Sequence, residues 1–144
     1  MCIRDRGCFR DTDFNGDITG WNVGSGTNFS FTFMDSSFNQ DIGSWDMSSA
    51  TGMSQMLRNT PFDQDISGWD ITNVTNMANF MTGNTAFSTS NYDALLVAWE
   101  AQTPQSNISV SFGDAQYTSG SSAETARTSL INTYNWTISD GGAV

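Results

Sequence analysis

Three aspartates that recur at one position of a repeating pattern are the first candidates for chemistry. Asp17, Asp41 and Asp65 stand 24 residues apart. If successive coils of the chain stack at strand spacing, these carboxylates lie about 5 Å apart, where like charges repel. We favour a turn in which each carboxylate accepts backbone amides, and the alternative is a calcium ion shared between coils. Because a glycine-rich calcium-binding nonapeptide is absent, no cofactor is predicted, with calcium as the alternative.

A second polar row follows five residues later in each unit. Its members are Asn22, Asp46 and Asp70, with Ser48 and Thr72 beside them. We expect these side chains to point outward from short strands and to form a flat, acidic, concave face. Such a face would suit a cationic or hydroxyl-rich partner, either an extracellular protein or a glycan. The alternative is an ordinary solvated surface.

Composition argues against several functional classes. The chain has no histidine, and no nucleophile motif or phosphate-binding loop occurs in it. Acids repeated along a surface are the opposite of two carboxylates facing each other across a cleft, so the protein is not expected to be an enzyme. The net charge of -10 would repel nucleic acid. No apolar run approaches the roughly 20 residues that span a bilayer, so no membrane insertion is expected.

The elements that position these rows are repeated units. Related segments begin at Phe14 (FNGDITGWNV), Phe38 (FNQDIGSWDM) and Phe62 (FDQDISGWDI), and Phe87 opens a degenerate copy. A period of this length predicts a solenoid, in which each unit buries its apolar side against its neighbours. The recurring tryptophans could form a platform for sugars, but their phase favours the core. They are Trp21, Trp45 and Trp69.

Within one unit, the apolar residues follow a spacing of three and then two, as in Ile66, Trp69 and Ile71. This spacing matches the core of leucine-rich repeats. Trp69 and Ile71 would lie on one face of a short strand. Apolar residues at i, i+3 and i+4 then predict a short helical turn that faces the same core. These residues are Met77, Phe80 and Met81.

The combined motif F-N-Q-D-I-x-x-W-D-[VMI]-x-x-[VA]-T-x-M-x-x-M resembles the roughly 25-residue repeat of BspA-like bacterial surface proteins, a leucine-rich-repeat-related family. The likeness covers residues 7–142. The first full unit departs from the motif at Gly26 and Thr32, where looser packing is expected. The resemblance implies secretion or surface display and, in some members, adhesion to host or matrix partners. It brings no catalytic residues.

The residues after the repeats have a different pattern. Ser90 with Asp93, and Ser121 with Glu124, each resemble a capping box that opens an amphipathic helix. The first helix would bury one face, and the second would turn Ala123, Ala126, Leu130 and Ile131 inward. Alternating residues 108–112 and the segment around residues 136–138 predict strands. The inward face of the first helix comprises Tyr92, Leu95, Leu96 and Trp99.

The chain is accordingly divided into three parts. Residues 1–6 (MCIRDR) resemble a translated sequencing-adaptor remnant and are expected to be a non-native leader. Residues 7–88 form the repeats, and residues 89–144 form a C-terminal capping region. Nothing comparable caps the first repeat, so an unpaired edge is expected there. Cys2 and Cys8 are expected to be unpaired.

These observations predict an α/β fold: a right-handed, leucine-rich-repeat-like solenoid of short parallel strands and short helical turns, closed by an α/β C-terminal cap. The expected function is that of a non-catalytic protein, secreted or displayed at the cell surface, which mediates adhesion or binds a protein or glycan through its concave face. The alternative is a structural spacer or stalk without a ligand of its own, with calcium as a candidate stabilising ion.

Overall fold

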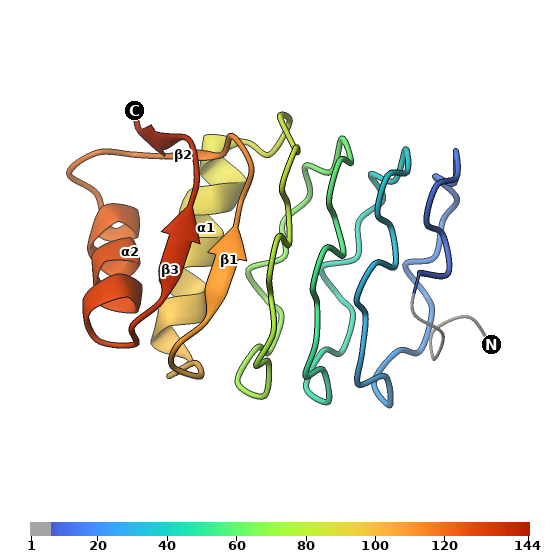
Figure 1. The fold of residues 1–144 in the computed structure, drawn as a ribbon, viewed down its shortest axis with the longest axis horizontal. Helices are drawn as coiled ribbons and strands as arrows, with labels where there is room; N and C mark the ends of the chain where they lie inside the picture. The colour runs from blue at the N-terminus through green and yellow to red at the C-terminus, as the bar shows by residue number, and fades with distance from the viewer. Residues whose placement is uncertain (1–6) are drawn as a thin grey trace.

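The computed structural model describes residues 7–144. Successive coils of chain stand side by side along the long axis of the molecule, and the helices gather at the C-terminal end (Figure 1). The described chain begins at the opposite end of the stack. The expectation of a non-native leader concerns residues 1–6, which lie outside the described residues.

One side of each coil, here called the ladder side, consists of residues 27–36, 51–60 and 75–84. Its backbone amides donate to carbonyls of the next coil, as Phe33 N does to Met56 O at 3.0 Å and Met53 N to Asn76 O at 2.8 Å. Parallel bridges join Asn28 to Gly52 and Gly52 to Asn76. Since the bonds repeat with the period of the sequence, each coil satisfies the polar backbone of its neighbour.

The prediction of a short helical turn on this side is wrong for the backbone, but the predicted burial of its apolar side chains is confirmed. Met77, Phe80 and Met81 are buried. Two residues of each ladder-side segment, four apart, have a positive φ, which breaks a helix and allows amides to point toward the next coil. Two columns repeat every 24 residues: Gly7, Phe31, Gln55 and Asn79, and then Asp11, Asp35, Asn59 and Gly83.

The other side of each coil, here called the turn side, consists of residues 14–26, 38–50 and 62–74. The strand predicted around Trp69 and Ile71 is wrong, because these residues lie in consecutive turns. Trp69 N donates to Ile66 O, and Val74 N donates to Ile71 O. The amides used in this way cannot form a ladder, so side chains join the coils instead.

The tryptophan column joins the coils on the turn side. The indole N–H groups of Trp45 and Trp69 donate to the carbonyls of Ile18 and Ile42 in the preceding coil, at 3.2 and 2.9 Å. Both indoles are buried, as predicted. Trp21 was also expected in the core, and this prediction is wrong, because its side chain is 39% exposed at the end of the stack. No described coil lies on its outer side, and its indole donates no hydrogen bond to residues 7–144.

Helix α1 (Thr89–Ala101) packs against the turn side of the last coil. Its predicted face is confirmed, since Tyr92, Leu95, Leu96 and Trp99 are all buried. Trp99 continues the tryptophan column by donating to Ile66 O at 3.3 Å. The helix therefore occupies the place that another coil would take.

The ladder side continues into short parallel strands. β1 (Ser109–Ser111) pairs with β3 (Thr137–Ser139), and β2 (Gln116–Tyr117) pairs with β4 (Gly142–Ala143). Met81 N donates to Ser111 O at 2.8 Å, so β1 adds directly to the last coil. Helix α2 (Ser122–Asn132) packs against α1.

The predicted capping residues are partly right. Ser121 is the N-cap of α2, as expected, and accepts from the amides of Ala123 and Glu124. The N-cap of α1 is Ser88 and not Ser90. Ile131, expected to face inward, is only partly buried.

The C-terminal segment is held by one buried carboxylate. Asp140 accepts a hydrogen bond from the Tyr92 hydroxyl at 2.6 Å and pairs with the Arg127 guanidinium at 2.7 Å. The Arg127 guanidinium also lies 4.9 Å from the centre of the Tyr117 ring. These contacts tie the chain after β3 to both helices.

The expectation of unpaired thiols is wrong for Cys8, which is disulfide-bonded. Cys2 lies outside the described residues.

The tryptophan column gives a direct test of the packing. We expect Trp69→Ala to lower the free energy of unfolding by about 3 to 5 kcal/mol, because it opens a cavity and leaves Ile42 O without its donor. Trp21→Ala is the matched control and should have a much smaller effect, since Trp21 is partly exposed. Urea unfolding followed by circular dichroism measures both. Equal losses would contradict the packing described.

Candidate functional site

The aspartate column folds onto its own backbone. Asp17 Oδ1 accepts from Thr19 N at 3.0 Å, and Asp41 Oδ1 accepts from Gly43 N at 2.9 Å. Asp65 Oδ1 accepts from Ser67 N, also at 2.9 Å. The turn role favoured from the sequence is confirmed for all three positions.

The second row has the same geometry. Asn22 Oδ1 accepts from Gly24 N at 3.2 Å. Asp46 and Asp70 each accept two bonds, from the amide and the hydroxyl of Ser48 and Thr72 respectively, and both hydroxyl contacts measure 2.6 Å. The row was expected on a strand but lies in turns. Its carboxylates remain exposed, while the hydroxyls of Ser48 and Thr72 are partly covered.

The turn bonds affect the carboxylates that accept them. The amide and hydroxyl of Thr19 lower the pKa of Asp17 below its ordinary value. The hydroxyl and amide of Ser48 do the same for Asp46. Because these hydrogen bonds stabilise the charged form, Asp17 and Asp46 keep their negative charge in mildly acidic solution.

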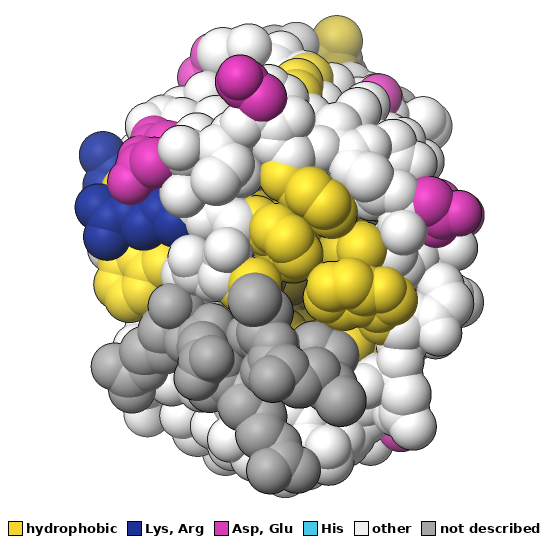
Figure 2. All heavy atoms as spheres, turned by 90° about the vertical axis from the view of Figure 1, so that its right-hand side faces the viewer, with side chains coloured by type: hydrophobic (Ala, Val, Ile, Leu, Met, Phe, Trp, Pro, Cys, Tyr) yellow, Lys and Arg dark blue, Asp and Glu magenta, His cyan; other side chains and the backbone are white. Residues whose placement is uncertain are grey.

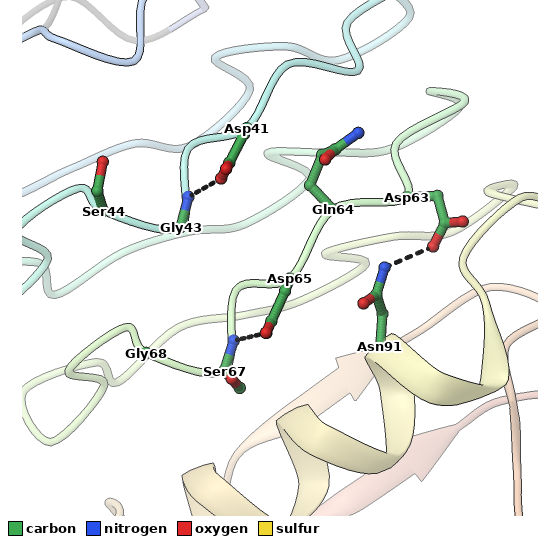
Figure 3. Close-up of a pocket in the computed structure, with 9 residues that line it drawn as sticks. All are labelled: Asp41, Gly43, Ser44, Asp63, Gln64, Asp65, Ser67, Gly68 and Asn91. Atoms are coloured by element: carbon green, nitrogen blue, oxygen red, sulfur yellow. Dashed lines mark hydrogen bonds between the residues drawn. The ribbon is translucent and has the colours of Figure 1, made fainter.

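Asp41 and Asp65 of the first row line an open hollow of about 530 Å³, whereas the second row lies outside its lining. Figure 3 shows that one coil contributes Asp41 and Ser44 and the next contributes Gln64 and Asp65, while Asn91 comes from α1. The close approach of two coils here requires a small residue, since a Cβ added to Gly43 would lie 2.4 Å from Asp65 O. The residues that line the hollow are polar or glycine.

Asp63 lies at the edge of this hollow and links the last coil to α1. Its Oδ1 accepts from Ser88 N and from the Asn91 amide, both at 2.8 Å. In the earlier coils an asparagine has this place, as Asn15 Oδ1 accepts from Asn39 N. The carboxylate replaces the amide only where a helix begins, and a negative charge near a helix N-terminus is favourable.

The pKa of Asp63 results from opposing effects. Partial burial raises it, but the hydrogen bonds from Ser88 and Asn91 outweigh burial and hold the pKa below the ordinary value of 3.8. The charged form therefore stabilises the folded state above that value, and this contribution is lost as the pH falls through the lowered pKa.

Sequence reasoning did not select Asp63, Gln64 or Asn91, although all three line the hollow. The available signal was the change from Asn15 and Asn39 to aspartate in one column of the repeat. The contact with Asn91 gave no such signal, because the helix lies outside the repeat.

No group of three or more carboxylate or thiol side chains in residues 7–144 is arranged to hold a metal ion. In the same residues, none of the helices has the length and hydropathy needed to cross a membrane. Within the aspartate column, the hydrogen bonds from turn amides to Asp17, Asp41 and Asp65 offset part of the repulsion between neighbouring carboxylates.

The link at Asp63 predicts a specific acid sensitivity. Asp63→Asn keeps Oδ1 as an acceptor but removes the charge, so we expect a loss of about 0.3 to 1 kcal/mol at neutral pH. The loss should shrink as the pH falls from 3.8 through the lowered pKa of Asp63, where the folded wild-type carboxylate takes up a proton. Urea unfolding at several pH values measures this. Asp114→Asn, an exposed change away from the α1 junction, is the control, and an equal loss there would contradict the assignment.

Calcium should have no effect on melting if the turn bonds suffice to hold Asp17, Asp41 and Asp65. We expect the same thermal unfolding curve in millimolar calcium and in excess chelator. A rise in melting temperature with calcium that Asp41→Asn abolishes would instead support the shared ion.

The repeats match a known protein family. Residues 6–95 match the family described as "Mycoplasma protein of unknown function, DUF285". The match covers the coils and the first part of α1, more than half of the chain. Comparison with curated proteins and with solved structures finds no match. On the strength of the repeats and of this match, the chain belongs to the DUF285 family.

Proposed function

We propose that this chain is a non-catalytic repeat protein of the BspA-like kind, displayed outside the cell, that binds another macromolecule through its turn side. The stack of coils would then be a leucine-rich-repeat-like solenoid, with α1 and the strands after it as the cap. The partner is an extracellular protein or a glycan that presents cationic or hydroxyl groups.

One observation carries this proposal. Exposed carboxylates recur at a fixed place in successive coils, at Asp41 and Asp65 and again at Asp46 and Asp70. Each is held by its own turn, so the row is preorganised and loses little entropy on binding. A regular array of negative charge favours a partner with positive charge or many hydroxyls.

A spacer or stalk is the second candidate, and the same turns favour it. The Oδ1 atoms of Asp46 and Asp70 already accept two hydrogen bonds each, so the row requires no ligand to satisfy it. On this view the charged turns keep the stack soluble and hold another domain away from the cell.

Charge-neutral variants distinguish the two. Asp46→Asn with Asp70→Asn retains the Oδ1 acceptors, so the melting temperature should fall only slightly, because a neutral amide oxygen accepts the same turn bonds more weakly than a carboxylate. Binding to immobilised poly-L-lysine, as a cationic probe, should weaken roughly two- to tenfold. The control is Asp11→Asn with Asp114→Asn, which removes the same charge elsewhere. Dextran serves as the hydroxyl-rich probe.

Each result bears on the proposal. A larger loss for the Asp46 and Asp70 pair than for the control supports binding through the turn side. Equal losses show only a net-charge effect and contradict it. If the wild-type protein binds neither probe, the spacer is the better account.

A further inference from the structure

The end of the stack nearest residue 7 exposes an apolar face. Figure 2 shows hydrophobic side chains gathered there. Trp21 is 39% exposed, and Phe9 and Phe14 are only partly buried against the core. The Phe9 and Phe14 rings stack 3.9 Å apart, and Phe9 lies 5.9 Å from Trp21. We call this aromatic group the end face.

The interior of the stack shows what covers the equivalent face of the later coils. Trp45 and Trp69 each donate to an isoleucine carbonyl of the coil before them. The phenylalanine column continues in the same way, since the Phe14 and Phe38 rings lie 6.2 Å apart, as do those of Phe38 and Phe62. Each of these faces is therefore covered by a segment of the preceding coil that contains a phenylalanine and, four residues later, an isoleucine whose carbonyl accepts the indole bond.

We infer that the end face is a docking site for a further coil of this same repeat. The further coil would place its phenylalanine over Phe14 and its isoleucine carbonyl at the indole N–H of Trp21. The inference follows from continuity with the interface already present twice in the stack, and it is independent of the proposed function of the turn side.

A second copy of the chain fits this face less well. Two end faces brought together would both offer the Trp21 indole donor, whereas the isoleucine carbonyl of this coil, Ile18 O, already accepts from Trp45 inside the stack. At the opposite end of the stack, the carbonyl of Ile66 already accepts from Trp99. The acceptor that Trp21 requires is therefore supplied by an uncapped coil.

One residue makes the new junction weaker than the internal ones. The side chains of Gln40 and Gln64 reach back to asparagines of the preceding coil. Gly16 has this position in the first coil and carries no amide. The docked coil would therefore be held by the aromatic column and the indole bond.

The test is a variant with one added coil. Residues 1–13 are replaced by a copy of residues 38–61, which joins directly to Phe14 and keeps the 24-residue period. The control carries serine at the copied positions of Phe38, Ile42 and Trp45. Hydrogen exchange of the indole N–H groups, followed by NMR, reports on each tryptophan separately.

In the extended variant we expect exchange at Trp21 to slow by at least about tenfold, while the serine control leaves it fast. Slow exchange at Trp45, Trp69 and Trp99 shows that both variants are folded. Fast exchange at Trp21 in a folded extended variant overturns the inference, and so does an extended variant that unfolds while the control folds. If Trp21 in the original chain becomes protected as its concentration and molecular mass rise together, a second copy is the occupant instead.

Discussion

The constraint on which this structure depends is that each coil must satisfy the polar groups of the next. The two sides do so differently. On the ladder side, backbone amides cross between coils, for example from Phe33 to Met56. On the turn side, the backbone amides donate within local turns. The indole N–H groups of Trp45 and Trp69 form the hydrogen bonds between coils instead. Both solutions require the same 24-residue period, because a shift of one residue would separate donors from acceptors on both sides.

The two ends of the stack follow from the same requirement. At the C-terminal end, Trp99 of α1 donates to Ile66 O, and the side chain of Gln102, the residue after α1, donates to Trp69 O and accepts from Ile71 N. β1 continues the ladder. A helix and a strand thus replace the two sides of a coil. At the other end, the indole of Trp21 points to no described acceptor. The exposed aromatics there are the unpaired half of a contact that the interior repeats.

Much of this arrangement could be predicted from the sequence, because it is local or periodic. The repeat length, the burial of Trp45 and Trp69, the turns at Asp41 and Asp65, and the buried face of α1 all follow from spacing. The ladder could not, since its left-handed positions include Phe31 and Gln55, which give no glycine signal. The burial pattern of such a backbone imitates a helical turn, which explains the wrong prediction on that side.

The turn side is the surface proposed to bind a partner because its exposed carboxylates recur in successive coils. The backbone amides of the ladder side are used in hydrogen bonds between coils. The central claim is therefore the register of the ladder. NMR scalar couplings across hydrogen bonds test it most directly. The account predicts couplings from Phe33 N to the Met56 carbonyl and from Met53 N to the Asn76 carbonyl. Couplings from these amides to carbonyls four residues earlier, as in a helical turn, would contradict it.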